Sequence, residues 1–357
     1  MTRPKSHSES ATAILLAWYD AHARALAWRA PPNSKTKPDP YRVWLAEIML
    51  QQTTVATVTP YFEKFLRQFP TLQSLANAPD EAVMAAWAGL GYYSRARNLL
   101  KCARLVMAAH GGKLPNQEAA LLQLPGIGAY TAAAIAAIAF NQPTAPVDGN
   151  IERVLARLFA LATKPPALKM RVREKLASLI KSVPANRAGD FIQALMDLGA
   201  TICTPKQPKC QLCVWQNICA AHATQKTNIL PHRAAKKPRP DRAGTIYWLT
   251  NAKGAVLMQR RPDKGLLGGM LTFPSNGWDA ANDTVLPALV PQGWSVLTGE
   301  VVHVFTHFRL TLKIVTQTAP KNFRKPTNCQ WIEPRDFATQ ALPSVMQKVA
   351  KRVLANR

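Results

Sequence analysis

A short stretch rich in glycine and alanine, residues 124–140, constrains the fold of this chain more than any other part of it. It reads LPGIGAYTAAAIAAIAF, so a proline ends one helix, two glycines form a turn, and an alanine-rich helix follows. Glycine allows a tight turn with exposed backbone N–H groups. At the start of a helix these donors and the helix dipole favour an anion. The stretch predicts a hairpin between two helices that binds a phosphodiester without contacting any base.

The loop after this helix contains one acidic residue, Asp148, within the sequence PVDGNIERVLAR. Pro143, Pro146 and Gly149 indicate a loop, and a further helix follows it. An aspartate directly before a helix is an ordinary N-cap residue. This segment alone therefore does not distinguish between a capping role and a catalytic role for Asp148.

The charge of the chain indicates a polyanionic partner. Its 357 residues include 45 Lys and Arg against 20 Asp and Glu, a net charge of +25. A basic chain kept soluble by its charge is the simpler interpretation, but a pI near 10.2 is typical of folded proteins that bind phosphates, so we favour a nucleic acid. No apolar run is long enough to span a membrane, and no cleavage pattern follows residues 11–17. We expect a cytoplasmic protein without a membrane partner.

The apolar pattern changes once along the chain, which predicts two domains. Residues 11–221 show helical periodicity with short breaks, and residues 31–40 are expected to form an exposed loop. Residues 232–242, HRAAKKPRPDR, have the composition of a linker. We predict an all-α domain over 1–222 and a linker over 223–243.

The remaining residues, 244–357, predict an α+β domain. The runs TIYWLTN, AVLMQRR, VVHVFTHFRLTLKIV and CQWIEP are rich in β-branched and aromatic residues, as strands are. Residues 336–356 then show a helical pattern.

Four of the six cysteines lie close together, with the spacing C-x6-C-x2-C-x5-C. A structural zinc site is the first alternative, but it usually has two short C-x2-4-C pairs, and here only one such pair exists. The spacing resembles the cluster loop of the endonuclease III superfamily of DNA glycosylases, which implies a [4Fe–4S] cofactor. Lys206 and Lys209 lie between the first two ligands, so we expect this loop to touch a DNA phosphate. The expected metal ligands are Cys203, Cys210, Cys213 and Cys219.

A second carboxylate, Glu47, lies in the sequence YRVWLAEIMLQQT, where it is the only acid. A helix that is apolar on nearly every face is buried. Burial raises the pKa of a carboxyl group, so Glu47 can stay protonated near neutral pH and act as a general acid. A buried structural pair with an arginine is the alternative.

Together the two carboxylates suggest a reaction. Release of a base from deoxyribose requires a proton on the leaving base and a negative charge beside the sugar cation. We assign Glu47 to protonate the base at a ring nitrogen and then to assist the attack of water. Asp148 then stays ionised and stabilises the sugar cation, or links to it transiently. A DNA-binding protein without activity has no need of an acid in an apolar helix.

The motifs VWLAEIMLQQT, GLGYYSRARNL, LPGIGAYTA and VDGNIERVLAR, with the four-cysteine loop, together resemble the MutY family. The resemblance covers nearly the whole chain. It implies a helix-hairpin-helix adenine DNA glycosylase of base excision repair, which removes adenine opposite 8-oxoguanine or guanine in duplex DNA. We expect it to act as a monomer in a bacterial cytoplasm, at the nucleoid.

The resemblance also implies roles for individual residues. At the hairpin, Tyr130 occupies the position at which bifunctional relatives have a nucleophilic lysine, so we expect a monofunctional enzyme that leaves an abasic site. Tyr130 and Asn150 complete the predicted catalytic set. The expected adenine pocket consists of Trp28, Arg29 and Gln193. The expected DNA and lesion contacts of this domain are Gln51, Gln52, Thr53, Leu90, Tyr92, Gly126 and Gly128.

The C-terminal domain resembles the MutT-like, or Nudix-like, domain of the same family. A working Nudix hydrolase requires a helix of the form R-E-x-x-E-E to hold magnesium. The corresponding segment here, WDAANDTVLPAL, lacks those glutamates, so we expect no nucleotide hydrolysis. The resemblance implies instead that Phe305, Thr306 and His307 recognise 8-oxoguanine, with Thr306 in place of the family's serine. Simple alternation along a strand is the other interpretation of this tripeptide.

Overall fold

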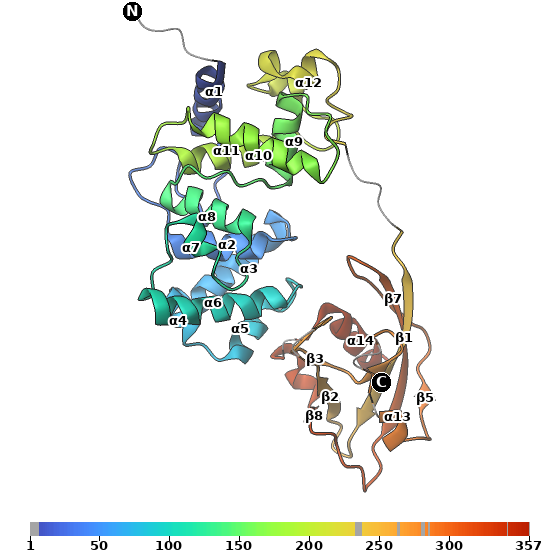
Figure 1. Cartoon of the computed structure of the whole chain (residues 1–357). Coiled ribbons are helices and arrows are strands. Elements are labelled where there is room, and N and C mark those ends of the chain that lie inside the picture. Colours follow the sequence, from blue (N-terminus) through green and yellow to red (C-terminus); the bar gives the residue numbers. More distant parts are fainter. Residues whose placement is uncertain are drawn as a thin grey trace, which may run out of the picture. The chain divides into compact units, whose positions relative to one another are not determined.

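The computed structural model describes residues 7–232, 238–262, 265–279, 283–284, 286–340 and 342–356, with side chains from residue 11 onward. It divides the chain into two compact units, shown in Figure 1. The first comprises Met1–Asn77 with Asn98–Ala235, and the second comprises Ala78–Arg97 with Lys236–Arg357. The predicted boundaries assign residues 78–97 to the helical domain instead. Part of the predicted linker, 233–237, lies outside the described residues, and those boundaries stay a prediction.

The described residues up to 232 form helices and no strand, which confirms the predicted all-α class of this part of the chain. Two helices near residue 90 are α5 (Asp80–Trp87) and α6 (Ser94–His110). The others are α1 (His7–His22), α2 (Pro40–Leu50), α3 (Val55–Gln68), α4 (Leu72–Ala76), α7 (Glu118–Leu121), α8 (Ala129–Phe140), α9 (Gly149–Leu158), α10 (Ala167–Ile180), α11 (Ala188–Thr201), η1 (Cys210–Leu212), η2 (Gln216–Ile218) and α12 (Ala220–Ala223).

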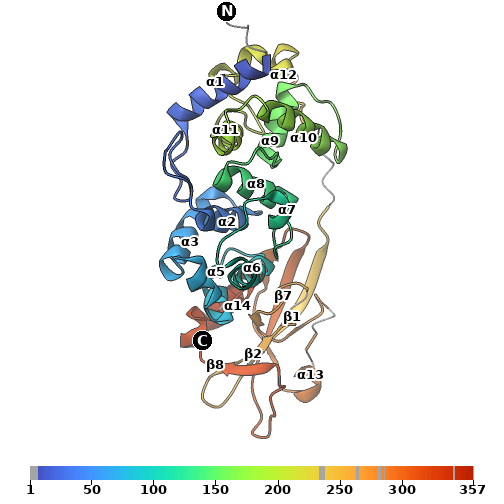
Figure 2. The ribbon, with the colours of Figure 1, turned by 60° about the vertical axis from the view of Figure 1, so that its left-hand side comes forward.

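Helix α8 forms the centre of the first unit, because its alanine side chains let neighbouring helices approach closely. It packs against α2, α7 and α11, and α11 in turn contacts α1 and α9. Figure 2 shows α11 between α1 and α8. A Cβ atom built on Gly189 would lie 2.8 Å from the backbone oxygen of Ala137, and one built on Gly199 would lie 2.7 Å from the Cβ of Asn150. Glycine at these two positions of α11 therefore allows its close packing on α8 and α9.

The ends of two helices place the predicted carboxylates. Helix α2 is capped by Asp39, whose side chain accepts from the Tyr41 amide at 2.9 Å, and Pro40 occupies its first turn. It ends at Leu50, so the last three residues of the predicted apolar motif lie beyond the helix. Helix α9 is capped by Asp148, whose Oδ1 accepts from the Ile151 amide at 2.7 Å.

The second unit contains a mixed sheet, which confirms the predicted α+β class. Its strands are β1 (Asp241–Thr250), β2 (Val256–Arg260), β3 (Leu271–Thr272), β4 (Ser275–Asn276), β5 (Ser295–Val296), β6 (Val301–Val304), β7 (Arg309–Thr318) and β8 (Cys329–Ile332), accompanied by α13 (Leu286–Leu289), η4 (Pro334–Ala338) and α14 (Ser344–Leu354). The described strands follow the order β3-β2-β1-β7-β5, with β4 beside β1, β6 beside β7 and β8 beside β2. Among these described strands only β1 and β7 pair in parallel, from Asp241 opposite Arg309 to Thr250 opposite Thr318.

The core of this unit lies between the sheet and α14. Buried Trp248 and Phe273 pack with ring centroids 4.7 Å apart, and Met346 of α14 belongs to the same cluster. Two sequence predictions differ from the structure. The run VVHVFTHFRLTLKIV forms two strands joined by a turn at 305–308, and the helix expected from residue 336 begins only at Ser344, after Pro343.

In the part of the chain that the structure describes, no helix has both the length and the apolar character needed to cross a membrane.

Candidate active site

An open pocket of about 880 Å³ in the first unit contains most of the predicted site residues. The predicted carboxylates line it together with the hairpin and the segment that follows α2. Twelve of the predicted residues are found there: Trp28, Arg29, Glu47, Gln51, Gln52, Thr53, Gly126, Gly128, Tyr130, Asp148, Asn150 and Gln193. Residues far apart in the sequence therefore form one site.

Glu47 lies on the pocket wall among the buried apolar residues of α2 and is only 8% exposed. Burial raises its pKa from 4.5 to about 7. The Tyr130 hydroxyl, which donates a hydrogen bond to it, lowers this pKa, while the charge of Asp148 raises it further and that of Arg29 lowers it. The carboxyl group can therefore hold a proton near neutral pH.

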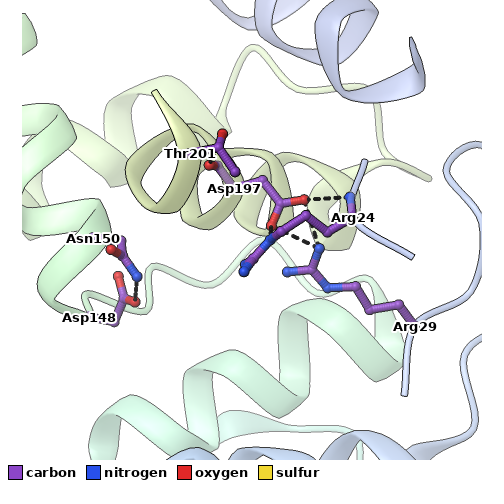
Figure 3. Close-up of polar contacts among 6 residues, drawn as sticks. All are labelled: Arg24, Arg29, Asp148, Asn150, Asp197 and Thr201. Carbon is purple, nitrogen blue, oxygen red and sulfur yellow. Dashed lines mark hydrogen bonds and ion pairs between the residues drawn. The ribbon is translucent and has the colours of Figure 1, made fainter. Parts of the chain in front are cut away.

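Asp148 belongs to the same pocket but has a more polar environment. Burial raises its pKa, and the amide groups of Ile151 and Asn150 and the charge of Arg153 oppose that shift. The Asn150 side chain also donates to Oδ2 of Asp148 at 3.0 Å, as Figure 3 shows. Capping and a place in the site are thus combined in one residue, since one oxygen of Asp148 caps α9 and the other binds Asn150.

The hairpin presents Tyr130 and exposed backbone at the start of α8. Gly126 has a φ of 78° and Gly128 is the N-cap of α8, with no side-chain hydrogen bond at the cap. Both glycines are exposed, so the first amide groups of α8 are available to an anion. Tyr130 is half-buried, and burial together with the negative charge of Glu47 and Asp148 raises its pKa well above 10. Its phenol therefore remains a hydrogen-bond donor.

The residues predicted for the adenine pocket come from two elements. Trp28 and Arg29 lie in the segment between α1 and α2, where the Trp28 ring packs edge-on against Phe62 at 5.1 Å. Gln193 lies on α11 and is 4% exposed. The exposed loop predicted over 31–40 is observed up to Asp39, and Pro40 already belongs to α2.

Sequence reasoning missed two residues beside this pocket. Arg24 lines it, and Asp197, which is fully buried in α11, binds both Arg24 and Arg29 (Figure 3). The sequence does contain a signal for Asp197. It is the only acid in the apolar run FIQALMDLGA, just as Glu47 is the only acid in its own helix.

Arg153 connects the pocket to the cysteine segment. Its guanidinium donates to Asn150 Oδ1 at 2.8 Å, to the Gly199 carbonyl at 2.7 Å and to the Cys203 carbonyl at 2.7 Å. Arg153 is 8% exposed. One buried cation therefore ties the Asp148 loop to α11 and to the first cysteine.

All four predicted metal ligands, Cys203, Cys210, Cys213 and Cys219, line a single cavity between the cysteine segment, α9 and α11. None of them forms a disulfide. Among the described residues no three His, Cys, Asp or Glu side chains are arranged around a single ion. A cluster of four irons takes one thiolate at each iron, so ligands distributed around a cavity suit it.

The surroundings of these thiols also fit a cationic iron–sulfur core. Burial, together with the neighbouring cysteines, raises the pKa of Cys213 to about 11. Four thiolates in one cavity therefore require positive charge at its centre. Arg157, which is 2% exposed, supplies part of it, because its Nη1 lies 3.3 Å from Cys203 Sγ and donates to the Thr204 carbonyl at 2.8 Å.

The other predicted lesion contacts lie in the second unit. Leu90 is 6% exposed, whereas Tyr92 is 39% exposed and has a φ of 48°. Phe305 is half-buried and stacks on Phe308 at 4.7 Å. Thr306 and His307 are exposed in the turn between β6 and β7, so alternation along a strand is the wrong interpretation of this tripeptide.

Family models match three parts of the chain. Residues 45–182 match the HhH-GPD superfamily of base excision DNA repair proteins, residues 203–219 the iron–sulfur binding domain of endonuclease III, and residues 245–352 the NUDIX domain. The solved structure of a thermostable thymine-DNA glycosylase superimposes with a TM-score of 0.53 at 28% identity, covering 61% of this chain and 97% of that one. Fold, pocket and cysteine cavity together define a helix-hairpin-helix DNA glycosylase of base excision repair that contains a [4Fe–4S] cluster.

Two relatives indicate which glycosylase family within this class the chain belongs to. The adenine DNA glycosylase of Buchnera aphidicola subsp. Acyrthosiphon pisum is 38% identical, over 96% of this chain and 97% of that protein, and that of Homo sapiens is 36% identical, over 94% and 72%. The chain belongs to the adenine DNA glycosylase, or MutY, family.

Proposed function

We propose that the enzyme hydrolyses the N-glycosidic bond of adenine paired with 8-oxoguanine or guanine in duplex DNA and leaves the strand intact at an abasic site. The observation that carries this proposal is the pair of carboxyl groups in one pocket, Glu47 protonated near neutral pH and Asp148 bound by amide donors. The names of the relatives support adenine as the released base.

Glu47 acts as the acid in this proposal. An adenine turned out of the duplex enters the 880 Å³ pocket, and the carboxyl group protonates a ring nitrogen of the leaving base. Proton loss leaves Glu47 able to accept a proton from the attacking water. The hydrogen bond from Tyr130 orients the carboxyl group and stabilises its ionised form. Trp28, Arg29 and Gln193 provide the surrounding wall for the base.

Asp148 stabilises the positive charge that develops on the sugar as the base leaves. Its position at the N-terminus of α9 and its bonds from Ile151 and Asn150 favour the ionised form at neutral pH. A short-lived covalent bond to the sugar is compatible with the same position.

The enzyme is monofunctional in this proposal, because Tyr130 replaces the lysine that bifunctional relatives use. A phenol has no amine nitrogen and therefore cannot form a Schiff base with the sugar. Lys169 of α10 also lines the pocket. A borohydride adduct formed through Lys169, together with strand cleavage, would contradict this part.

Recognition of the opposite base is assigned to the remaining predicted residues. Gln51, Gln52 and Thr53 line the pocket next to the hairpin, where side chains can replace the stacking of the lost base. The exposed Thr306 and His307 offer hydrogen-bonding groups for 8-oxoguanine, with Leu90 and Tyr92 as further contacts.

The cluster has a structural role in this proposal. When bound, it cross-links the four cysteines, and with Arg153 and Arg157 it fixes the loop that presents Lys206 and Lys209. Both lysines are exposed and are expected to contact DNA phosphates.

One assay tests the proposal. The protein is incubated with duplexes containing adenine opposite 8-oxoguanine, adenine opposite guanine, an oxidised pyrimidine, or only normal pairs, and each sample is divided and treated with or without alkali. We expect strand breaks only after alkali and only at the mispaired adenine. Breaks without alkali at the oxidised pyrimidine would overturn it.

A further inference from the structure

Asp197 is a buried anion that lies outside the catalytic pocket and binds two cations that line it. Its carboxylate is fully buried and accepts from Arg29 Nη1 at 2.9 Å and 2.8 Å, one bond to each oxygen. The same oxygens accept from Arg24 Nε at 2.7 Å and from the Arg24 amide at 3.0 Å. Figure 3 shows both guanidinium groups converging on it.

This arrangement controls how Arg29 faces the pocket. In the described part of the chain, Arg29 Nη1 donates to Asp197, and Nε and Nη2 of Arg29 donate no hydrogen bond. Arg29 is 7% exposed, and both arginines line the pocket that contains Glu47. One edge of the planar guanidinium is thus fixed by Asp197, which leaves the other edge for a bound base.

Asp197 also balances charge. Together the two arginines and the carboxylate have a net charge of +1, and neutralising the carboxylate would leave the buried Arg29 and the partly exposed Arg24 without their counter-ion. Such excess positive charge would favour ionisation of any nearby acid.

We infer that Asp197 is a positioning residue for base excision, which orients the guanidinium of Arg29 toward the bound adenine and offsets its charge so that Glu47 keeps its proton. This inference rests on the proposed function, because it assumes that Glu47 is the general acid. Asp197 acts only through Arg29 and does not touch the substrate.

The charged and titratable groups that act on Glu47 come from three elements. Tyr130 at the start of α8 lowers its pKa by hydrogen bonding, Asp148 before α9 raises it, and Arg29 between α1 and α2 lowers it. Tyr130 and Asp148 are unchanged when Asp197 is neutralised. The pKa of Glu47 then falls because Arg29 is no longer compensated, so the protonated form is lost at a lower pH.

The test is the pH profile of single-turnover adenine release by the full-length protein with its cluster. In the wild type we expect release to fall as pH rises through about 7, the pKa of Glu47. In Asp197→Asn we expect this midpoint to move down by about one pH unit. The plateau rate should fall about 10- to 100-fold, the usual size of a hydrogen bond to a charged group.

Asp190→Asn is the matched control. Asp190 lies on the same helix and holds Arg187 at 2.8 Å and the Asn33 amide at 3.1 Å, but none of these residues lines the pocket. We expect its midpoint to equal that of the wild type. If Asp197→Asn retains its cluster and has the midpoint of the wild type, the inference is wrong. If the wild type releases no adenine, it is the proposed function that fails.

Arg29→Gln combined with Asp197→Asn removes one cation together with its counter-ion, so this pair of changes remains informative if Asp197→Asn alone does not fold. Arg29→Gln should move the midpoint upward, and adding Asp197→Asn to it should leave that midpoint unchanged, because the mediator is already absent. A further downward shift in the double variant would overturn the inference, since Asp197 would then act on Glu47 without Arg29.

Discussion

The catalytic pocket and the cysteine cavity use residues of the same two helices, α9 and α11, but they treat their ionisable groups differently. In the pocket, Glu47 and Asp148 line an open volume of about 880 Å³, and burial raises the pKa of both. In the cavity, the four cysteines line a single space. In the pocket, hydrogen bonds and nearby arginines offset the burial of the two acids only in part, whereas in the cavity the four thiols surround one space.

The difference suggests how substitutions should act at the two sites. A substitution in the pocket should abolish activity and leave the fold equally or more stable, because burying the native ionisable groups there destabilises the folded state. A change in the cavity should weaken the fold, because ligand binding at that site is part of the folding free energy.

The largest effect is expected for Asp148→Asn. The amide oxygen can still accept from Ile151, so the cap on α9 and the fold should persist. Single-turnover adenine release should fall by about a thousandfold or more, since the sugar cation loses its counter-charge. Affinity for a mispaired duplex, measured by fluorescence anisotropy, should change less than about threefold.

Asp39→Asn tests this interpretation against a capping effect. Asp39 caps α2 as Asp148 caps α9, but it does not line the pocket. Full activity is expected of this variant. A fully active Asp148→Asn enzyme would remove Asp148 from the mechanism.

The next effect is expected for Cys213→Ser. Loss of one of four thiolates should deplete the iron and its visible absorption, and the segment 203–219 has only the short helices η1 and η2 to replace it. We expect a melting temperature lower by about 5 °C or more, with weaker DNA binding. Cys102→Ala, which alters a buried cysteine of α6, should retain the full absorption. If the Cys213→Ser protein keeps its full iron content and is as stable as the wild type, the cysteine cavity does not contribute to folding in the way proposed.

An effect of opposite sign, on stability, is expected for Glu47→Gln. The folded state raises the pKa of Glu47 from 4.5 to about 7, so it favours the protonated form, and the wild type loses stability as pH rises through this range. A shift of this size corresponds to about 3 kcal/mol. Glutamine cannot ionise, so the variant should gain stability relative to the wild type at pH 8 but not at pH 4. Urea unfolding midpoints of both proteins at pH 4 and pH 8 measure this effect. If the variant differs from the wild type by the same amount at both pH values, the raised pKa of Glu47 does not cost the folded state any stability.

Much of the site could be predicted from the sequence because its chemistry uses residues that are unusual in their local setting. Glu47 is the only acid in an apolar helix, and the cysteines are crowded in a chain that has only six. Both features depend on neighbours along the chain. The fold class could be predicted for the same reason, since helical and strand periodicities are local.

The rest depends on contacts between distant segments. Asp197 and Arg29 are 168 residues apart, and neither position indicates the other. The paired strands β1 and β7 are likewise distant, and the turn that exposes Thr306 interrupts a run whose composition is typical of one strand. Ion pairs and strand pairs between distant segments depend on tertiary packing, which cannot be deduced from a single sequence.

The absent side chain at Gly199 has a consequence for the active site. A Cβ atom at this position would lie only 2.7 Å from the Cβ of Asn150, so α11 directly supports the residue that binds Asp148. Asp148 is thus held in place through Asn150 by the close packing of α9 on α11. A larger residue at position 199 would therefore displace Asn150 and, with it, the hydrogen bond to Asp148.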